Sequence, residues 1–139
     1  MPEPPDTAAG ALESRTFKLV NDHRRTIGLA PLAHDARIAA VARRHSRNMA
    51  EGRVPAGHEG FEARQREISK VIPLRGIAEN VGVNDYPRSD TVRSAVSGWL
   101  GSRGHRSNIE GRYDLTGVGI ARDAHGVYYY TQIFVRRKR

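Results

Sequence analysis

Residues 99–109 read W-L-G-S-R-G-H-R-S-N-I and join a run with helical apolar spacing to a glycine-rich run typical of a strand. Gly101 and Gly104 let the backbone bend sharply or approach a neighbour closely. We therefore predict a crowded polar turn that holds His105 beside a rigid helix, a suitable place for chemistry. The alternative is an ordinary loop histidine, unless other polar groups of the chain converge on it.

Apolar residues recur at helical spacing in four segments, at residues 12–27, 38–49, 61–71 and 92–100. Gly28 is expected to close the first helix in a left-handed conformation, and Asp35 to cap the second. Ser89 or Asp90 is expected to cap the fourth. His45 falls on the apolar face of the second helix, which favours a buried structural histidine over a ligand.

The pattern changes at Ile77–Val83, where apolar residues alternate as in a half-buried strand. Glu79 shares the face of the β-branched residues of this strand. A buried carboxylate needs partners, because isolated burial of its charge is costly. We predict that Glu79 lies in a cleft against histidines; the alternative is a glutamate at a strand end that reaches solvent.

Two further strands are predicted at residues 115–121 and 127–135, joined by a hairpin connection at 123–126. Tyr128–Tyr130 suit a central strand, and an aromatic platform for nucleic acid is the less favoured interpretation. The order of elements does not alternate as in a parallel β-α-β protein. The predicted class is α+β, a three-layer α-β-α sandwich around a small, mostly antiparallel sheet.

The length of 139 residues suits one domain, predicted at residues 12–135, after a flexible lead-in at 1–11 and before a basic tail at 136–139. The absence of cysteine excludes disulfides, thiolate nucleophiles and cysteine-ligated zinc. No apolar run approaches the roughly 20 residues that span a bilayer, and no stretch resembles a signal peptide. The net charge of +8 favours anionic partners such as phospholipid headgroups, cell-wall polymers or nucleic acid.

Seven motifs together resemble the CAP superfamily (cysteine-rich secretory, antigen 5 and pathogenesis-related 1 proteins), and in particular its cysteine-free bacterial branch. In chain order they are L-V-N-D-H-R-R-T-I-G-L-A-P-L (19–32), A-R-R-H-S-R-N-M-A (42–50), G-H-E-G-F-E-A-R (57–64), A-E-N-V (78–81), the opening stretch 99–109, L-T-G-V-G-I-A (115–121) and Y-Y-Y-T-Q-I-F (128–134). The resemblance implies an exported α-β-α sandwich with a cleft of two histidines and two glutamates that often holds a divalent metal.

By this resemblance, His58 is similar to the first cleft histidine, Glu79 to the first glutamate and His105 to the second histidine. Ser102 stands where eukaryotic members carry the second glutamate, so the carboxylate pair is incomplete. Asn80 and Asn108 belong to the same motifs and complete the predicted cleft. Two imidazoles and one carboxylate are a sensible donor set for Zn²⁺ or another divalent cation, with His58 and His105 as ligands. They suit equally a metal-free hydrogen-bonded cluster.

Two functions follow as expectations. The leading one is a secreted binding module that presents the cleft to a small ligand, a lipid or an extracellular partner, with an anionic cell-surface polymer as a further candidate. The alternative is a metal-dependent, peptidase-like hydrolase in which Glu79 is the general base for a zinc-bound water. Nucleic-acid binding has only the diffuse positive charge in its favour and no reader motif.

Overall fold

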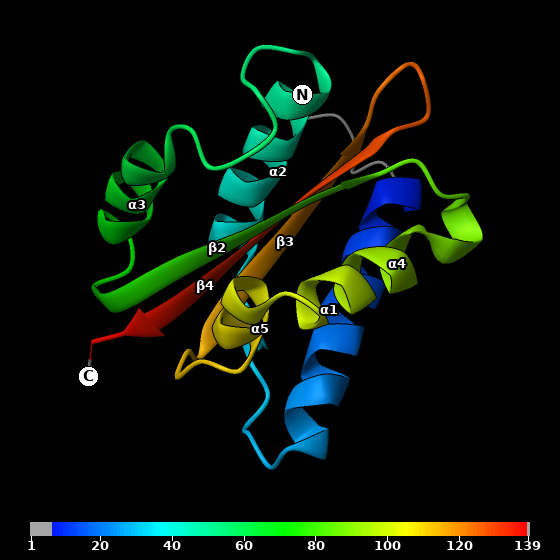
Figure 1. Cartoon of the computed structure of the whole chain (residues 1–139). Coiled ribbons are helices and arrows are strands. Elements are labelled where there is room, and N and C mark those ends of the chain that lie inside the picture. Colours follow the sequence, from blue (N-terminus) through cyan, green and yellow to red (C-terminus); the bar gives the residue numbers. More distant parts are fainter. Residues whose placement is uncertain (1–6, 139) are drawn as a thin grey trace.

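The computed structural model describes residues 7–138, which form five helices and four strands in three layers (Figure 1). The helices are α1 (Thr7–Thr26), α2 (Ala36–Ala50), α3 (Phe61–Ser69), α4 (Arg88–Leu100) and α5 (Arg103–Ile109). The strands are β1 (Ala33–His34), β2 (Leu74–Asn84), β3 (Leu115–Arg122) and β4 (Tyr128–Arg137). No helix among the described residues is both long and apolar enough to cross a membrane.

The strands form one sheet in the order β1-β3-β4-β2. β4 pairs antiparallel with both β2 and β3, and only the two-residue β1 pairs in parallel, with β3. The predicted α+β sandwich with a mostly antiparallel sheet is therefore confirmed. β4, which carries Tyr128–Tyr130, is a central strand as expected.

Alternating residues of the strands feed two hydrophobic cores, one on each face of the sheet. On one face, Tyr130 and Phe134 of β4 pack with apolar residues of α1, α4 and α5. On the other face, Ile133 and Val135 pack with apolar residues of α2 and α3. Trp99 is buried in the first core, where its indole N–H donates to the Val81 carbonyl at 3.1 Å, so the indole is a core residue.

Glycines allow α2 to lie directly on β3. A Cβ atom at Gly117 would come within 2.2 Å of the Ala39 backbone nitrogen, and one at Gly119 within 2.1 Å of the Arg43 nitrogen. Distances this short are impossible for real atoms, so only glycine permits this contact. α2 itself begins at its predicted cap, because the Asp35 carboxylate accepts from the Arg37 and Ile38 amides.

Side chains form hydrogen bonds with backbone groups on β2 and on the part of β3 that extends beyond its short pairing with β1. Glu13 of α1 accepts from the Ile120 amide of β3 at 3.0 Å and from the Arg43 guanidinium of α2. At the opposite edge, in β2, the Val81 carbonyl accepts from the Trp99 indole. The Glu79 carbonyl accepts from the side-chain amide of Asn108.

Several boundaries differ from the sequence-based expectations. The predicted polar turn around His105 is mostly the short helix α5. α4 begins at Arg88, with Pro87 in the cap position, so neither Ser89 nor Asp90 caps it. α1 already includes Thr7–Ala11, and β4 includes Arg136 and Arg137. The rest of the predicted lead-in, residues 1–6, and the last residue of the predicted tail lie outside the described residues.

Candidate functional site

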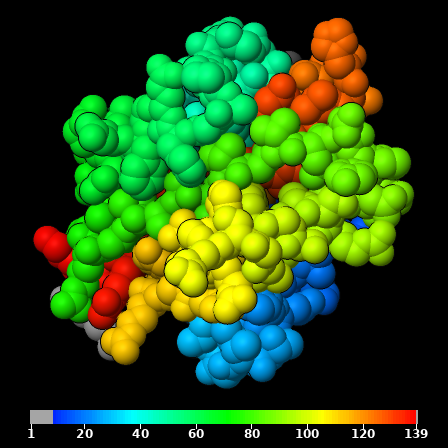
Figure 2. All heavy atoms as spheres, viewed as in Figure 1, coloured from blue at the N-terminus to red at the C-terminus, as the bar shows by residue number. Residues whose placement is uncertain are grey.

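The predicted site residues lie around the outer edge of β2, between α3 and α5. Alternation along this strand turns Glu79 toward the layer of α2 and α3, and Asn80 toward α5. In Figure 2 the segment that contains His58 and the helix α5 lie on the same face of the molecule. The site therefore has one half on each side of a single strand.

Glu79 is buried, and a buried arginine balances its charge. Only 1% of the Glu79 side chain and 9% of the Arg64 side chain are exposed. The guanidinium donates through Nε to one carboxylate oxygen at 2.7 Å and through Nη2 to the other at 2.8 Å. This fork-to-fork pair gives both carboxylate oxygens a charged hydrogen-bond donor.

His58 extends this pair to the surface. Its Nδ1 lies 2.9 Å from Glu79 Oε1, and 55% of its side chain is exposed. A carboxylate that is paired with arginine only accepts, so Nδ1 of His58 carries the proton and donates. In the neutral imidazole, Nε2 then keeps its lone pair for a ligand.

His45 lies behind the pair as a structural residue, as its position on the apolar face predicts. Its Nε2 donates to the Gly57 carbonyl at 2.7 Å, and its Nδ1 lies 3.1 Å from Arg64 Nη1, from which it accepts. Burial lowers the pKa of His45, and the Arg64 charge lowers it further, against the opposing effect of the Gly57 hydrogen bond. His45 is therefore held neutral, which lets it orient the guanidinium.

His105 approaches from the other side of β2. Its Nδ1 lies 2.9 Å from the Ser102 hydroxyl oxygen. Burial lowers the pKa of His105, and the nearby His58 lowers it further. We call His58 and His105, which flank β2 from its two sides, the imidazole pair.

Two asparagines fasten α5 to β2. Asn80 donates its side-chain amide to the His105 carbonyl at 3.1 Å, and Asn108 donates to the Asn80 side-chain oxygen at 2.9 Å. Asn80 is fully buried. These amides act as positioning groups that fix the backbone of His105 relative to the strand.

The described residues contain no group of three or more His, Cys, Asp or Glu side chains that could hold a metal ion. Glu79 is turned toward Arg64 and His58, so it suits the role of a carboxylate that orients a histidine rather than that of a metal ligand. Within this arrangement, the donors that suit a divalent cation are the two imidazole nitrogens.

Arg64 is the residue that sequence reasoning missed. It lies three residues after Phe61 and four before Ile68, on the buried face of α3. A charged residue at a core position of a helix, combined with a carboxylate at a core position of a strand, is the signal that could have revealed the pair.

Comparison with known proteins gives a consistent result. The model of CAP, the cysteine-rich secretory protein family, matches residues 17–134. An uncharacterized membrane protein of Bacillus subtilis, YlbC, is 33% identical over 132 residues, which cover 90% of this chain and 34% of YlbC. The chain thus spans about a third of the length of that curated relative.

Solved structures of bacterial proteins share the fold. An extracellular protein with an SCP domain from Bacillus anthracis is 29% identical, with a TM-score of 0.76 over 99% of this chain and 45% of that chain. An outer surface protein of Borrelia burgdorferi has the same TM-score at 16% identity, over 92% of this chain and 94% of that one.

Proposed function

Because the chain belongs to the CAP (cysteine-rich secretory protein) family, we propose that it is an exported binding module whose ligand-binding site is the imidazole pair. The observation that carries the proposal is the way in which both imidazoles are held. Each is hydrogen-bonded through Nδ1, one to Glu79 and one to Ser102, and the proposal is that their Nε2 atoms bind a common ligand. Pre-oriented donors reduce the entropic cost of binding.

A divalent cation is the first ligand that we propose for these nitrogens. His58 and His105 would supply two imidazole donors, and a bound small molecule or lipid headgroup would complete the coordination. Such a metal acts as a Lewis acid that attracts anionic oxygen atoms. The Arg64–Glu79 pair would orient His58, and we expect weaker affinity than at a structural zinc site with four protein ligands.

Binding is favoured over hydrolysis by the surroundings of Glu79. A general base must be free to accept a proton, whereas both oxygens of Glu79 already accept from Arg64. Ser102 and His105 form a contact of the kind seen between a nucleophile and a base, but within residues 7–138 no carboxylate is hydrogen-bonded to His105.

Calorimetric titration with Zn²⁺ tests the metal component. We expect one saturable site in the unaltered chain and loss of binding in His58→Ala and in His105→Ala. His125→Ala is the matched control, because His125 lies in the β3–β4 turn. Equal binding by all four proteins would contradict the proposal.

A panel of labelled sterol and fatty acids, titrated with and without Zn²⁺, tests the ligand component. Saturable binding that His58→Ala weakens is the expected result. If no lipid of the panel binds saturably, the lipid part of the proposal fails.

A further inference from the structure

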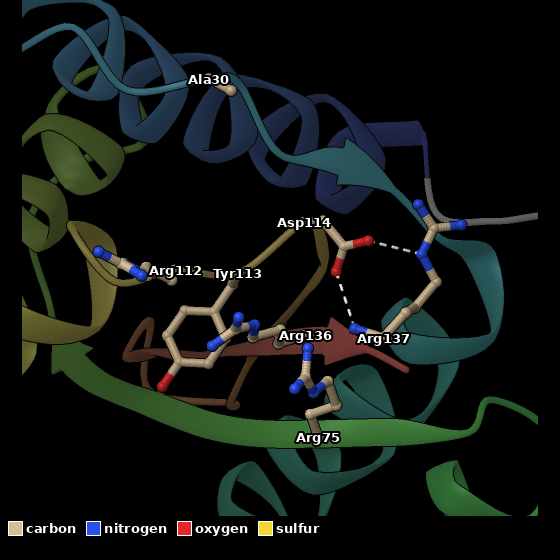
Figure 3. A pocket seen from close by; sticks show the side chains of 7 residues that line it. All are labelled: Ala30, Arg75, Arg112, Tyr113, Asp114, Arg136 and Arg137. Carbon is tan, nitrogen blue, oxygen red and sulfur yellow. Dashed lines mark hydrogen bonds and ion pairs between the residues drawn. The ribbon is translucent and has the colours of Figure 1, made fainter. Parts of the chain in front are cut away.

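An arginine-lined hollow lies at the far end of the sheet from α4, where β2 begins and β4 ends (Figure 3). Its volume of about 470 Å³ is within the range of small-molecule sites. The residues that line it include four arginines, a tyrosine and an aspartate: Arg75, Arg112, Arg136, Arg137, Tyr113 and Asp114. None of these residues belongs to the site of the imidazole pair.

One of the four arginines is neutralised. The Asp114 carboxylate accepts from Arg137 Nε at 2.6 Å and from the Arg137 amide at 2.9 Å (Figure 3). Burial raises the pKa of Asp114, but these hydrogen bonds outweigh it and leave the pKa below its ordinary value. Asp114 is therefore ionised near neutral pH and balances Arg137.

The other three arginines have no acidic partner within the described part of the chain. No hydrogen bond or ion pair engages the side chains of Arg75, Arg112 or Arg136 there, and all three are exposed. They come from three separate places in the sequence, so the fold brings around one hollow three positive charges that no acidic residue of segment 7–138 balances.

The walls of the hollow are held in place by buried contacts. Tyr113 packs against Phe134 with ring centroids 5.7 Å apart. A Cβ atom at Gly111 would lie 2.5 Å from the Tyr113 ring, so this glycine makes room for it. The buried guanidinium of Arg24 donates to the carbonyls of Ile109 and Gly111, both at 2.8 Å. These two hydrogen bonds hold the backbone next to Arg112 in place.

An irregularity in the sheet separates the arginines of the two strands. Gly76 pairs with Arg136 and Leu74 with Arg137, and the register shifts at Arg75 between them. A register shift of this kind, a β-bulge, commonly changes the direction in which a side chain points. In Figure 3, Arg75 and Arg136 lie on the same side of the Tyr113 ring, and Arg112 lies beyond it.

We propose that this hollow is a phosphate-binding site, which takes a group with at least two negative charges. A single carboxylate would balance only one guanidinium, whereas a doubly charged phosphate group presents several acceptor oxygens to three arginine forks. Tyr113 forms part of the wall of the hollow. The phosphate can belong to a soluble compound or to a phosphomonoester lipid headgroup, and the experiment below separates the two.

The test is titration of the unaltered chain with pyrophosphate at constant ionic strength of about 0.15 M, where the field of exposed charges is screened over about 8 Å. We expect one saturable site. Arg112→Gln/Arg136→Gln should weaken it at least about tenfold, which is about 1.4 kcal/mol, since charge-assisted hydrogen bonds are lost. Arg47→Gln/Arg66→Gln removes the same charge from exposed positions on α2 and α3 and should change the affinity less than about twofold.

Vesicles of phosphatidylcholine with and without phosphatidic acid form the second arm. If they bind the chain, and pyrophosphate displaces it, the hollow accepts lipid headgroups; if only pyrophosphate binds, its phosphate comes from soluble compounds. Absence of saturable binding of both probes overturns the proposal. So does an equal loss in the two double variants, with thermal unfolding showing that both are folded, because the effect would then be one of net charge.

Discussion

Glu79 is stable inside the protein because Arg64 neutralises it, and this pair gives the sharpest prediction at the residue scale. Arg64→Met should lower the free energy of unfolding by about 3–5 kcal/mol, since it leaves a buried carboxylate without its partner. Chemical denaturation measures the change. Arg64→Met/Glu79→Leu should recover most of the loss, because no charge then remains buried.

The control for this pair is Arg44→Met, which removes the exposed ion pair between Arg44 and Glu67 that also links α2 to α3. Exposed pairs contribute about 0–1 kcal/mol. An Arg64→Met protein as stable as Arg44→Met would show that the buried pair does not hold the site together.

His45 makes stability depend on pH. Its folded-state pKa is lowered from 6.5, mainly by burial. Below pH 6.5 the unfolded chain therefore binds more protons than the folded one, and stability should fall as the pH falls from 6.5 toward the lowered value. Denaturation at several pH values between about 7.5 and 5 measures this slope.

In His45→Gln the slope should be smaller, while the part that His105 contributes in the same direction persists. Glutamine retains an amide that can donate to the Gly57 carbonyl, so the comparison isolates the titration. An unchanged slope would mean that His45 does not account for the acid sensitivity.

At the scale of the elements, the contact between α2 and β3 requires that Gly117 and Gly119 of β3 carry no side chain. Gly117→Ala should lower the free energy of unfolding by about 1–3 kcal/mol or more, because its Cβ would overlap the backbone of Ala39. Gly98→Ala, in the exposed face of α4 with open space around it, should instead stabilise by about 0.5–1 kcal/mol. Thermal unfolding of the two variants should therefore shift in opposite directions.

The same elements show what a sequence can reveal. The spacing of apolar residues in segments 38–49 and 77–83 predicted α2 and most of β2. Burial of one face of a helix or strand makes apolar residues recur at a regular interval in the sequence. β1 was missed, since two residues are too few to show a period. The turn predicted around His105 is a helix, because tertiary packing of Ile109, which is fully buried, outweighs the cost of Gly104.

Site prediction had a similar limit. Motifs singled out His58, Glu79 and His105 as candidates, and the structure places them around one edge of β2. The Arg64–Glu79 pair was missed because the partner of a buried charge is fixed by packing between elements, which no local pattern records. The arginines around the hollow, three of which have no acidic partner among residues 7–138, could not be predicted for the same reason.

At the scale of the whole molecule, Glu13 connects three elements that lie on both faces of the sheet. Glu13→Ala should lower the free energy of unfolding by about 1–3 kcal/mol or more, because it leaves the buried Ile120 amide unpaired and removes the partner of Arg43. Chemical denaturation measures the loss. Glu62→Ala removes an equal charge from the surface of α3 and should change stability by less than about 0.5 kcal/mol. A loss of similar size in both variants would contradict this role of Glu13.

The side chains that are hydrogen-bonded to backbone groups of β2 and β3 affect how copies of the protein behave when they are crowded together. An uncovered strand is a template on which another polypeptide can grow, and many folds need charge or proline to prevent it. Here Glu13 accepts from an amide of β3 beyond the end of its pairing with β1, while Trp99 and Asn108 donate to carbonyls of the outer strand β2. Copies held at high density, or tethered beside other β-rich domains, should therefore remain separate units instead of merging into a continuous ribbon.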